Sequence, residues 1–298
     1  MSLTSLALVI ASLVLTKLVL RRLRYKPLKK GAVAVITGGG SGVGLALAER
    51  FARSGCKVVL IGRNQDALKK AVEHCKQCGA PHADFIVADL SKPDSAAAIQ
   101  RSVCQMHEEG SVKYLVLNAG AGAIAPFTSE ERFHTICEDM MNINYLANVR
   151  LLQKFLPVLT RSHAKASPSR IIVISSLAGV LPSILRSAYT ASKHAIQGFM
   201  NALRGETDIP ITLCCPGYVD TDFHGRVMTN DGKPLGGHQR RGVSPEVCAK
   251  ECLEGALHGD AEVIMTLAGK LGYTLRPWLT GIVDFMAKRK SLNSLKNK

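Results

Sequence analysis

Acidic residues are missing from both ends of this sequence, although the whole chain carries a net charge of +15. Residues 1–30 hold seven Lys or Arg and residues 288–298 hold five, and neither segment contains an Asp or Glu. These two arms account for all but +3 of the net charge. A nucleic-acid-binding protein would spread its basic residues over one face of a folded domain. The distribution therefore argues against a nucleic-acid partner and favours an anionic membrane surface.

The cysteines form no regular framework that would indicate disulfide bonds. The chain has nine of them, an odd number, in a sequence of 298 residues, so reduced thiols in a cytosolic setting are expected. The stretch His74–His82 also contains Cys75 and Cys78, which are ligand types at metal-binding spacing. A structural zinc usually needs a closed four-ligand set, and this stretch is instead typical of a helix end followed by a turn. We therefore predict no metal site.

An apolar run opens the chain. Residues 3–20 are apolar except for four hydroxyl side chains and Lys17, and this length is just enough to span a bilayer as a helix. Basic residues follow at 21–26, whereas a cleaved signal peptide carries its charge before the apolar run. We predict that residues 1–24 form a membrane anchor helix with a basic flank. The flank should stay cytoplasmic and place the body in the cytosol, with the endoplasmic reticulum as the default membrane. The alternative is a hairpin or an interfacial helix in one leaflet.

From residue 31 onward, short apolar runs alternate with longer amphipathic ones, without an internal repeat or a linker rich in Pro, Gly or Ser. Fully apolar strands between helices indicate a parallel sheet covered on both faces. We predict an α/β fold: one Rossmann-type doubly wound domain over 31–265, followed by an apolar and basic C-terminal extension, 266–298. The long aperiodic stretch 216–243 is predicted to be a substrate lid. The predicted strands are 33–36, 57–61, 85–88, 114–117, 171–174, 211–214 and 262–265, and the predicted helices are 43–54, 65–77, 94–109, 129–160, 187–205 and 245–258.

A glycine-rich turn, residues 37–44, follows the first predicted strand and opens a helix. Glycines let the backbone approach a pyrophosphate, and the helix N-terminus favours an anion there. About twenty residues further on, the second strand ends at Arg63, which suits the 2′-phosphate of NADP, whereas an acid would suit NAD. We therefore predict NADP(H) rather than NAD(H). Asp89 and Leu90, after the third strand, fall where an adenine contact is expected, although Asp89 could equally be a turn residue.

Tyr189 and Lys193 are four residues apart and lie on the same face of a predicted helix. A buried ammonium beside a phenol stabilises the phenolate, so we expect Lys193 to lower the pKa of Tyr189. Either Ser175 or Ser176 could reach this pair, because adjacent strand residues face opposite ways.

These residues belong to a longer series of motifs. The turn has the spacing T-G-x-x-x-G-x-G, and it is followed in order by Asn118-Ala119-Gly120, Asn144, Ser175-Ser176, Tyr189-x-x-x-Lys193 and Pro216-Gly217. In this order and spacing, the sequence resembles the short-chain dehydrogenase/reductase family over residues 31–265. The stretches around Ser176, Tyr189 and Thr221 are similar to the membrane-anchored branch of members 7 and 7B. The 11β-hydroxysteroid dehydrogenases and 3-ketodihydrosphingosine reductases are more distant.

The resemblance implies a catalytic tetrad. Tyr189 would protonate a substrate carbonyl during hydride transfer, and Lys193 would tune Tyr189 and hold the nicotinamide ribose. Ser176, thirteen residues before the tyrosine, would bond the carbonyl, and Asn144 would support a proton relay through water. Ser176, Tyr189 and Arg186 are the predicted substrate contacts. The predicted cofactor contacts are Thr37, Gly38, Gly40, Ser41, Gly42, Val43, Gly44, Arg63, Asp89, Leu90, Asn118, Ala119, Gly120, Tyr189, Lys193, Pro216, Gly217, Val219 and Thr221.

The C-terminal segment bears on the substrate. Residues 263–287 are apolar but interrupted by charges, and their aromatics suit a helix at a membrane interface; a homodimer contact or a core-covering helix is the alternative. A membrane-held enzyme could take a lipophilic carbonyl from the bilayer, such as a steroid, a retinoid, a 3-keto sphingoid base or an acyl-dihydroxyacetone phosphate. Arg186 would favour an anionic headgroup, or is an ordinary surface arginine. The alternative to an enzyme is a membrane-tethered cofactor-binding scaffold.

Overall fold

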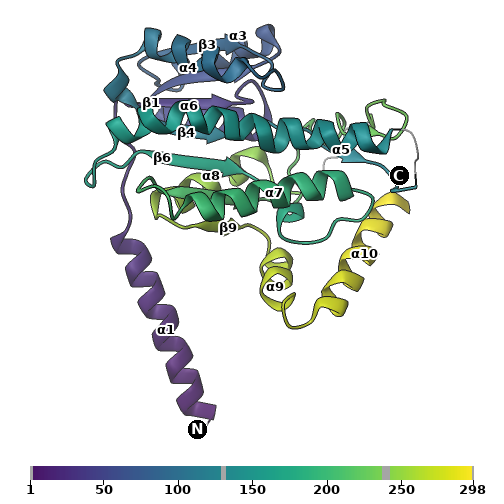
Figure 1. The fold of residues 1–298 in the computed structure, drawn as a ribbon. Helices are drawn as coiled ribbons and strands as arrows, with labels where there is room; N and C mark the ends of the chain where they lie inside the picture. The colour runs from purple at the N-terminus through teal and green to yellow at the C-terminus, as the bar shows by residue number, and fades with distance from the viewer. Residues whose placement is uncertain (1–2, 129–131, 237–241, 297–298) are drawn as a thin grey trace.

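A parallel sheet of seven strands forms the centre of the computed structural model, which describes residues 3–128, 132–236 and 242–296 (Figure 1). The strand order is β3-β2-β1-β4-β6-β7-β9, the doubly wound arrangement that alternating strands and helices predict. Each predicted strand is confirmed, with ends that differ by a few residues. The strands are β1 (Val33–Thr37), β2 (Lys57–Gly62), β3 (Ala83–Val87), β4 (Val112–Leu117), β6 (Arg170–Ile174), β7 (Ile211–Cys215) and β9 (Glu262–Ile264).

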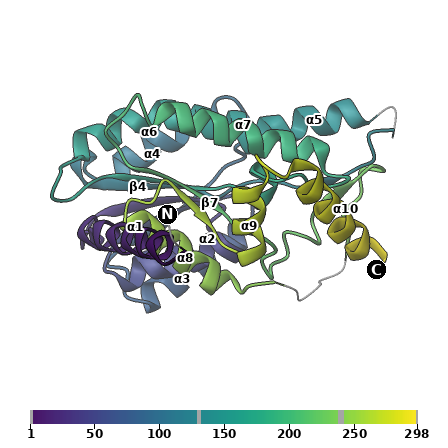
Figure 2. The same ribbon diagram turned by 90° about the horizontal axis from the view of Figure 1, so that it is seen from below.

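Helices cover both faces of this sheet, so its strands are buried on both sides (Figure 2). Ala34 and Ile36 of β1 pack with one helical layer, whereas Val33 and Val35 pack with the other. This alternation follows from the period of two along a strand. The first layer contains α2 (Gly42–Arg53), α3 (Gln65–Gln77) and α8 (Pro245–Leu257), and the second contains α4 (Ser95–Met106), α6 (Ala147–Ser162) and α7 (Ser187–Leu203).

The long helix predicted over 129–160 is divided in the structure. It consists of α5 (Phe133–Met141), a π-helical turn η2 (Asn142–Leu146) and α6, while residues 129–131 lie outside the described part of the chain. The amphipathic pattern continues through the turn, which is why the sequence predicts one helix. A π-turn adds one residue to the helical repeat and is frequent at functional sites.

Two short strands escape prediction. β5 (Ala123–Ile124) pairs with β8 (Met228–Thr229), and two-residue strands are too short to show a period. β8 lies in the stretch predicted as a substrate lid, 216–243, so part of that stretch is fixed against the region that follows β4. Residues 237–241 of the predicted lid lie outside the described residues.

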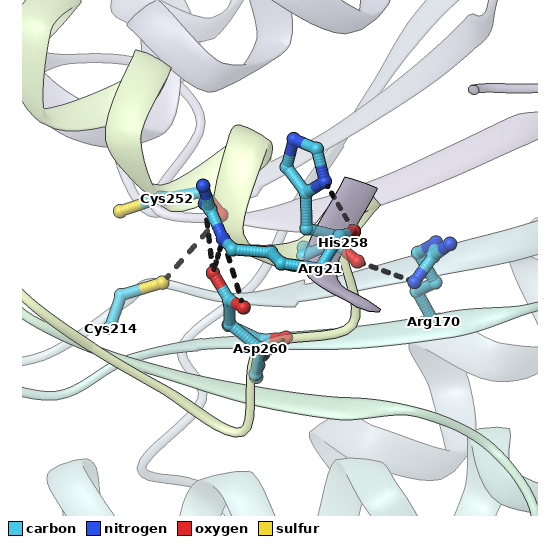
Figure 3. Close-up of polar contacts among 8 residues, drawn as sticks. Arg21, Arg170, Cys214, Cys252, His258 and Asp260 are labelled. Atoms are coloured by element: carbon cyan, nitrogen blue, oxygen red, sulfur yellow. Dashed lines mark hydrogen bonds and ion pairs between the residues drawn. The ribbon is translucent and has the colours of Figure 1, made fainter. Parts of the chain in front are cut away.

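The first helix, α1 (Leu3–Leu23), projects away from the body (Figure 1). Its C-terminal end is joined to the body by a polar contact (Figure 3): Arg21 Nε donates to both carboxylate oxygens of Asp260 at 3.2 and 3.0 Å, and His258 Nδ1 lies 3.0 Å from the Arg21 carbonyl oxygen. Just beyond the helix, Lys26 N donates to Leu257 O at 2.9 Å. In the part of the chain that the structure describes, no helix combines the length and apolar character needed to cross a membrane, so the predicted spanning anchor is not confirmed.

The C-terminal extension forms two further helices, α9 (Leu267–Leu275) and α10 (Thr280–Lys296). Gly269 of α9 packs closely on the body, because a Cβ at this position would lie 2.7 Å from Leu177 Cδ2. Leu177 opens the short 3-10 helix η3 (Leu177–Gly179) that follows β6. The extension therefore borders the carboxyl edge of the sheet.

Candidate active site

Tyr189 and Lys193 lie one turn apart on α7, and each is only 5% exposed. Lys193 Nζ is 5.9 Å from the centroid of the Tyr189 ring and donates to Ile174 O at 3.0 Å. Burial lowers the pKa of Lys193 to about 8. Burial also raises the pKa of Tyr189 above its ordinary value, against the opposing effects of a hydrogen bond with Ser176 and the charge of Arg186.

The raised pKa of Tyr189 differs from the expectation that Lys193 lowers it. The two side chains are neighbours, as their spacing predicts, but the loss of solvent around both groups is the largest effect on each. Desolvation favours the neutral form of a phenol and of an amine alike. The cation that opposes it at Tyr189 is Arg186.

Ser176 is the serine that the structure brings to Tyr189. It follows β6 and caps η3, where its Oγ accepts from Ala178 N at 3.1 Å, and its hydrogen bond with Tyr189 favours the ionised phenol. Ser175 points the other way: a Cβ on Gly179 would lie 2.8 Å from Ser175 Oγ, and that buried oxygen has no hydrogen-bond partner among the described residues. Their opposite orientations follow from the strand period.

Asn144 is fully buried in the π-turn η2, and both the oxygen and the nitrogen of its side-chain amide form hydrogen bonds. Its Oδ1 accepts from Ala121 N at 2.9 Å, and its Nδ2 donates to Ala121 O at 2.9 Å and to Ser192 Oγ at 3.0 Å. Ser192 Oγ in turn donates to Tyr189 O at 2.8 Å. The turn thus ties the segment after β4 to the first turns of α7. Gly120 lies against this amide, since a Cβ there would be 2.7 Å from Asn144 Oδ1 and 3.6 Å from Lys193 Nζ.

The glycine-rich turn is held against the end of β4. Thr37 Oγ1 accepts from Asn118 N at 2.9 Å and from Ala119 N at 3.0 Å. Asn118 Nδ2 donates back to the carbonyl oxygens of Thr37 and Gly38, at 3.0 and 3.2 Å. Gly38 has a φ of +65°, a left-handed conformation that glycine adopts at little cost. These bonds fix the shape of the turn where it enters α2.

Two further positions of the same turn disfavour a side chain. A Cβ on Gly44 would lie 2.2 Å from Gly38 O, and one on Gly42, whose φ is +55°, would lie 3.1 Å from Thr221 Cγ2. Ser41, Gly42 and Thr221 line a cavity of about 220 Å³ at the N-terminus of α2. Backbone N–H groups at a helix N-terminus, without side chains above them, fit the pyrophosphate of a dinucleotide. The predicted cofactor residues Gly40 and Val43 pack on the other side, toward α3 and the core.

The residues predicted to contact the adenosine end lie at the carboxyl ends of β2 and β3. Arg63 follows β2 and is exposed, so its guanidinium is accessible to a phosphate. Asp89 Oδ1 accepts from Ser91 N at 3.0 Å and from Ser91 Oγ at 2.8 Å, and these bonds, more than the charge of Arg63, lower the Asp89 pKa. These bonds place Asp89 in a turn, its contact with adenine stays a prediction, and Leu90 beside it is buried.

The predicted nicotinamide residues lie after β7. Pro216 O accepts from Leu177 N at 2.9 Å, and a Cβ on Gly217 would lie 3.0 Å from Thr266 Cγ2. Val219 is buried and bridges to Val243. This segment thus runs between η3, which Ser176 caps, and the start of α9.

Arg186 lies beside the ring of Tyr189. Its Cζ is 5.8 Å from the centroid of the Tyr189 ring, and burial lowers the pKa of its guanidinium. The preceding residue, Leu185, has a φ of +60°, which is strained for a branched side chain. Its carbonyl oxygen accepts from Ala125 N at 2.9 Å, next to β5. Phe223 also lies near Tyr189, with the two ring centroids 6.4 Å apart.

Two side chains at this site escape the sequence-based predictions. Ser192 connects Asn144 to Tyr189, and its position just before Lys193 is a signal that could have indicated a buried polar role. Phe223 lies in an aperiodic stretch, where nothing in the sequence marks its contact with Tyr189.

Comparisons with known proteins agree with this geometry. Residues 32–232 match the family model described as short chain dehydrogenase. The chain is 34% identical over 282 residues to a "Dehydrogenase/reductase SDR family protein 7-like" of Dictyostelium discoideum, covering 92% of this chain and 87% of that protein. It is 32% identical over 256 residues to "Dehydrogenase/reductase SDR family member 7B" of Mus musculus, covering 83% and 77%.

Solved structures with bound dinucleotides are also similar. An alcohol dehydrogenase from Thermococcus sibiricus, complexed with 5-hydroxy-NADP, matches with a TM-score of 0.65 and 26% identity over 78% of this chain and 94% of that one. A short chain dehydrogenase/reductase from Burkholderia phymatum, in complex with NAD, matches with a TM-score of 0.72 and 25% identity over 83% and 93%. The neighbours thus hold NAD in one case and an NADP derivative in the other.

Proposed function

The chain belongs to the short chain dehydrogenase family, and we propose that it transfers hydride between NADP(H) and a lipophilic carbonyl or alcohol, acting as a reductase. The observation that carries this proposal is the convergence of Ser176, Tyr189, Lys193 and Asn144 beside the glycine-rich turn. The reductive direction rests on the NADP preference, because cells usually keep that cofactor reduced.

Each residue has a task in this proposal. When bound, the nicotinamide supplies the hydride. Tyr189 gives its proton to the carbonyl oxygen, and Ser176 donates a hydrogen bond to the same oxygen as negative charge develops there. Lys193, one turn below Tyr189, holds the cofactor ribose and passes a proton back toward the tyrosine. Asn144 keeps the backbone around Ala121 and Ser192 in place, so that the relay keeps its geometry.

The NADP preference rests on Arg63. The residue is exposed at the end of β2, where a guanidinium can bind a 2′-phosphate. Among the residues of the turn itself, Ser41 offers a hydroxyl and no cation. We therefore assign the phosphate selectivity to Arg63.

Membrane association is the second part of the proposal. α1, α9 and α10 extend from the same side of the body (Figures 1 and 2). Apolar side chains on them are exposed, among them Leu18 on α1, Leu271 on α9 and Phe285 on α10, and Trp278 between α9 and α10 is 84% exposed. An apolar face with aromatic and basic residues suits the interfacial region of a bilayer. Because α9 packs on η3 next to Ser176, a docked membrane would lie close to the substrate site.

Arg186 narrows the substrate class. Its half-buried guanidinium lies against the Tyr189 ring, and a cation in such a position favours a substrate that brings its own negative charge. We propose a lipid ketone with an anionic headgroup. Replacing Arg186 with Ala should reduce turnover of phosphorylated ketones more than that of neutral ketones of equal chain length, and an equal effect on both would refute this assignment.

The location and partners follow from the same elements. We propose that the protein is held at the endoplasmic reticulum with its catalytic domain in the cytosol. We propose membrane lipids as its partners and no binding of nucleic acid.

Liposome flotation tests the membrane contact. Trp278→Ser with Phe285→Ser should weaken flotation, whereas Phe127→Ser, at an 80% exposed position that follows β5 and lies outside α9 and α10, should not. Equal flotation of all variants would contradict a role for α9 and α10, and a dimer in solution would favour the alternative use of this segment.

The decisive experiment for the enzyme measures NADPH consumption with a panel of lipid ketones, together with NADPH and NADH binding. Tyr189→Phe should bind NADPH normally and lose turnover by about 10²–10⁴-fold, the range for a general acid. Turnover that survives this change would refute the mechanism. Tight NADPH binding without turnover of any ketone would instead favour a membrane-tethered cofactor-binding scaffold.

A further inference from the structure

A second cluster of reactive side chains lies away from the candidate active site. His82, Asp84 and His107 bring one ring nitrogen each and one carboxylate oxygen within 4.8 Å of one another. His82 Nε2 lies 2.7 Å from Asp84 Oδ2, and the His82 and His107 rings meet edge to face with centroids 5.5 Å apart. Two imidazoles and a carboxylate are a common ligand set for a divalent transition metal.

This cluster lies at the amino ends of the strands, whereas the candidate active site lies at their carboxyl ends. Asp84 is the second residue of β3 and His82 precedes that strand, so both lie at its amino end. His107 caps the C-terminus of α4, shortly before β4 begins at Val112. The tetrad and the glycine-rich turn lie at the carboxyl ends of the strands. A ligand held here would therefore join α4 to the edge strand β3 without touching the reacting atoms.

One ring nitrogen of His107 has no hydrogen-bond partner among the described residues. The residue is only 6% exposed, and this nitrogen, Nε2, is buried. A buried polar atom without a partner is costly and calls for an explanation. Burial lowers the pKa of His107 from its ordinary value.

The other candidate cluster offers a comparison. Glu49, His74 and Cys78 also lie within ligand distance of one another. There, however, His74 Nε2 lies 3.3 Å from Glu49 Oε2, and Arg53 Nη2 is paired with Glu49 Oε1 at 2.7 Å. No buried atom of that cluster lacks a partner among the described residues.

We propose that His82, Asp84 and His107 bind one divalent transition metal ion, with Zn²⁺ as the best match, and that the ion fastens α4 to the edge of the sheet. Tetrahedral zinc with bonds of about 2.0–2.1 Å separates its ligand atoms by about 3.3 Å. The His82 Nε2–Asp84 Oδ2 pair, now 2.7 Å apart, would open to that value, and all three ligand atoms already lie within 4.8 Å of one another. Water would complete the coordination.

Zn²⁺ and Co²⁺ binding to the full-length protein tests this site. After chelator treatment, Zn²⁺ affinity is measured by competition with a chromophoric chelator, and the midpoint of thermal unfolding is recorded with and without Zn²⁺. His82→Gln and Asp84→Asn change side chains that are partly exposed, and His107→Gln removes the buried ligand. His74→Gln is the matched control, since it removes a histidine from the other cluster.

One equivalent of Zn²⁺ should bind to the wild type and to His74→Gln, and raise their unfolding midpoints. Affinity should fall at least about tenfold in His82→Gln and Asp84→Asn, by analogy with the cost of disturbing a metal's supporting shell. Unchanged affinity in these two variants would refute the proposal even if His107→Gln fails to fold. Loss of binding in His74→Gln, or a thiolate charge-transfer band in the Co²⁺ spectrum, would place the metal at the other cluster and also refute it.

Discussion

Alanine substitutions at Gly44 and Gly40 test the packing of the glycine-rich turn, because the structure predicts a clash at Gly44 and ordinary contacts at Gly40. A Cβ on Gly44 would lie 2.2 Å from Gly38 O and 2.5 Å from Asn118 Nδ2, whereas one on Gly40 would make ordinary contacts at 3.5 Å with Ala67 and Leu68. Contacts below 3.0 Å are essentially never seen for a Cβ. In Gly44→Ala the backbone of the turn must therefore move by roughly 1 Å, as overpacked sites do.

The magnitude follows from what that movement breaks. Overpacking costs about 1–3 kcal/mol, and losing the two Asn118 hydrogen bonds adds about 1 kcal/mol each. The total cost is about 3–5 kcal/mol, so at about 2–4 °C of midpoint shift for each kcal/mol in a chain of this size, Gly44→Ala should unfold roughly 6–20 °C below the wild type. NADPH binding should weaken at the same time, because the displaced N–H groups are those proposed to hold the pyrophosphate. Gly40→Ala should match the wild type in both measurements, made by calorimetry and NADPH fluorescence. Equal behaviour of the two variants would refute the packing argument.

Three further outcomes follow from the site. Arg63→Ala should weaken NADPH binding by about tenfold or more while leaving NADH binding unchanged, and an equal loss for both dinucleotides would remove Arg63 as the selectivity residue. Ser176→Ala should lose about 10²–10³ in turnover, as expected for a carbonyl-stabilising donor, whereas Ser175→Ala should keep its activity and its stability, because Ser175 Oγ has no hydrogen-bond partner among the residues that the structure describes. Burial lowers the pKa of Lys193 from 10.5 to about 8, so the unfolded chain binds this proton more tightly and the lysine costs stability below pH 8. In thermal melts the stability of the wild type relative to Lys193→Met should therefore rise from about pH 8 to about pH 10.5, and a difference that does not change with pH would show that the lysine is solvated.

The sheet is predicted from sequence because its signals are local. Each strand is a short apolar run bounded by a helix with its own period, so the order of elements follows without tertiary information. The glycine-rich turn is equally local, since Gly38, Gly42 and Gly44 are needed by the backbone of the turn itself.

Features that depend on contacts between distant segments are not available from such patterns. The π-turn around Asn144 keeps the amphipathic pattern of its neighbours, and β5 and β8 are two residues each. The positive φ of Leu185 has no sequence signal at all, because a leucine is not favoured there. This strained residue leads directly into Arg186, and strain of this kind persists only where the surrounding structure holds it.

The pair Tyr189 and Lys193 shows what sequence spacing can and cannot predict within one site. A spacing of four residues predicts that the two side chains are neighbours, and they are, but it carries no information on how much solvent surrounds them. That depends on segments outside the helix, among them Ser176, which bonds Tyr189, and Phe223, whose ring centroid lies 6.4 Å from that of Tyr189. In that surrounding, burial has the largest effect on both groups, and Arg186 is the cation that favours the ionised phenol. The pKa of Tyr189 is therefore set by burial and by Ser176, which the spacing on the helix does not encode, together with Arg186 at the start of the helix. A substrate that brings an anion to Arg186 would change this pKa along with its own binding.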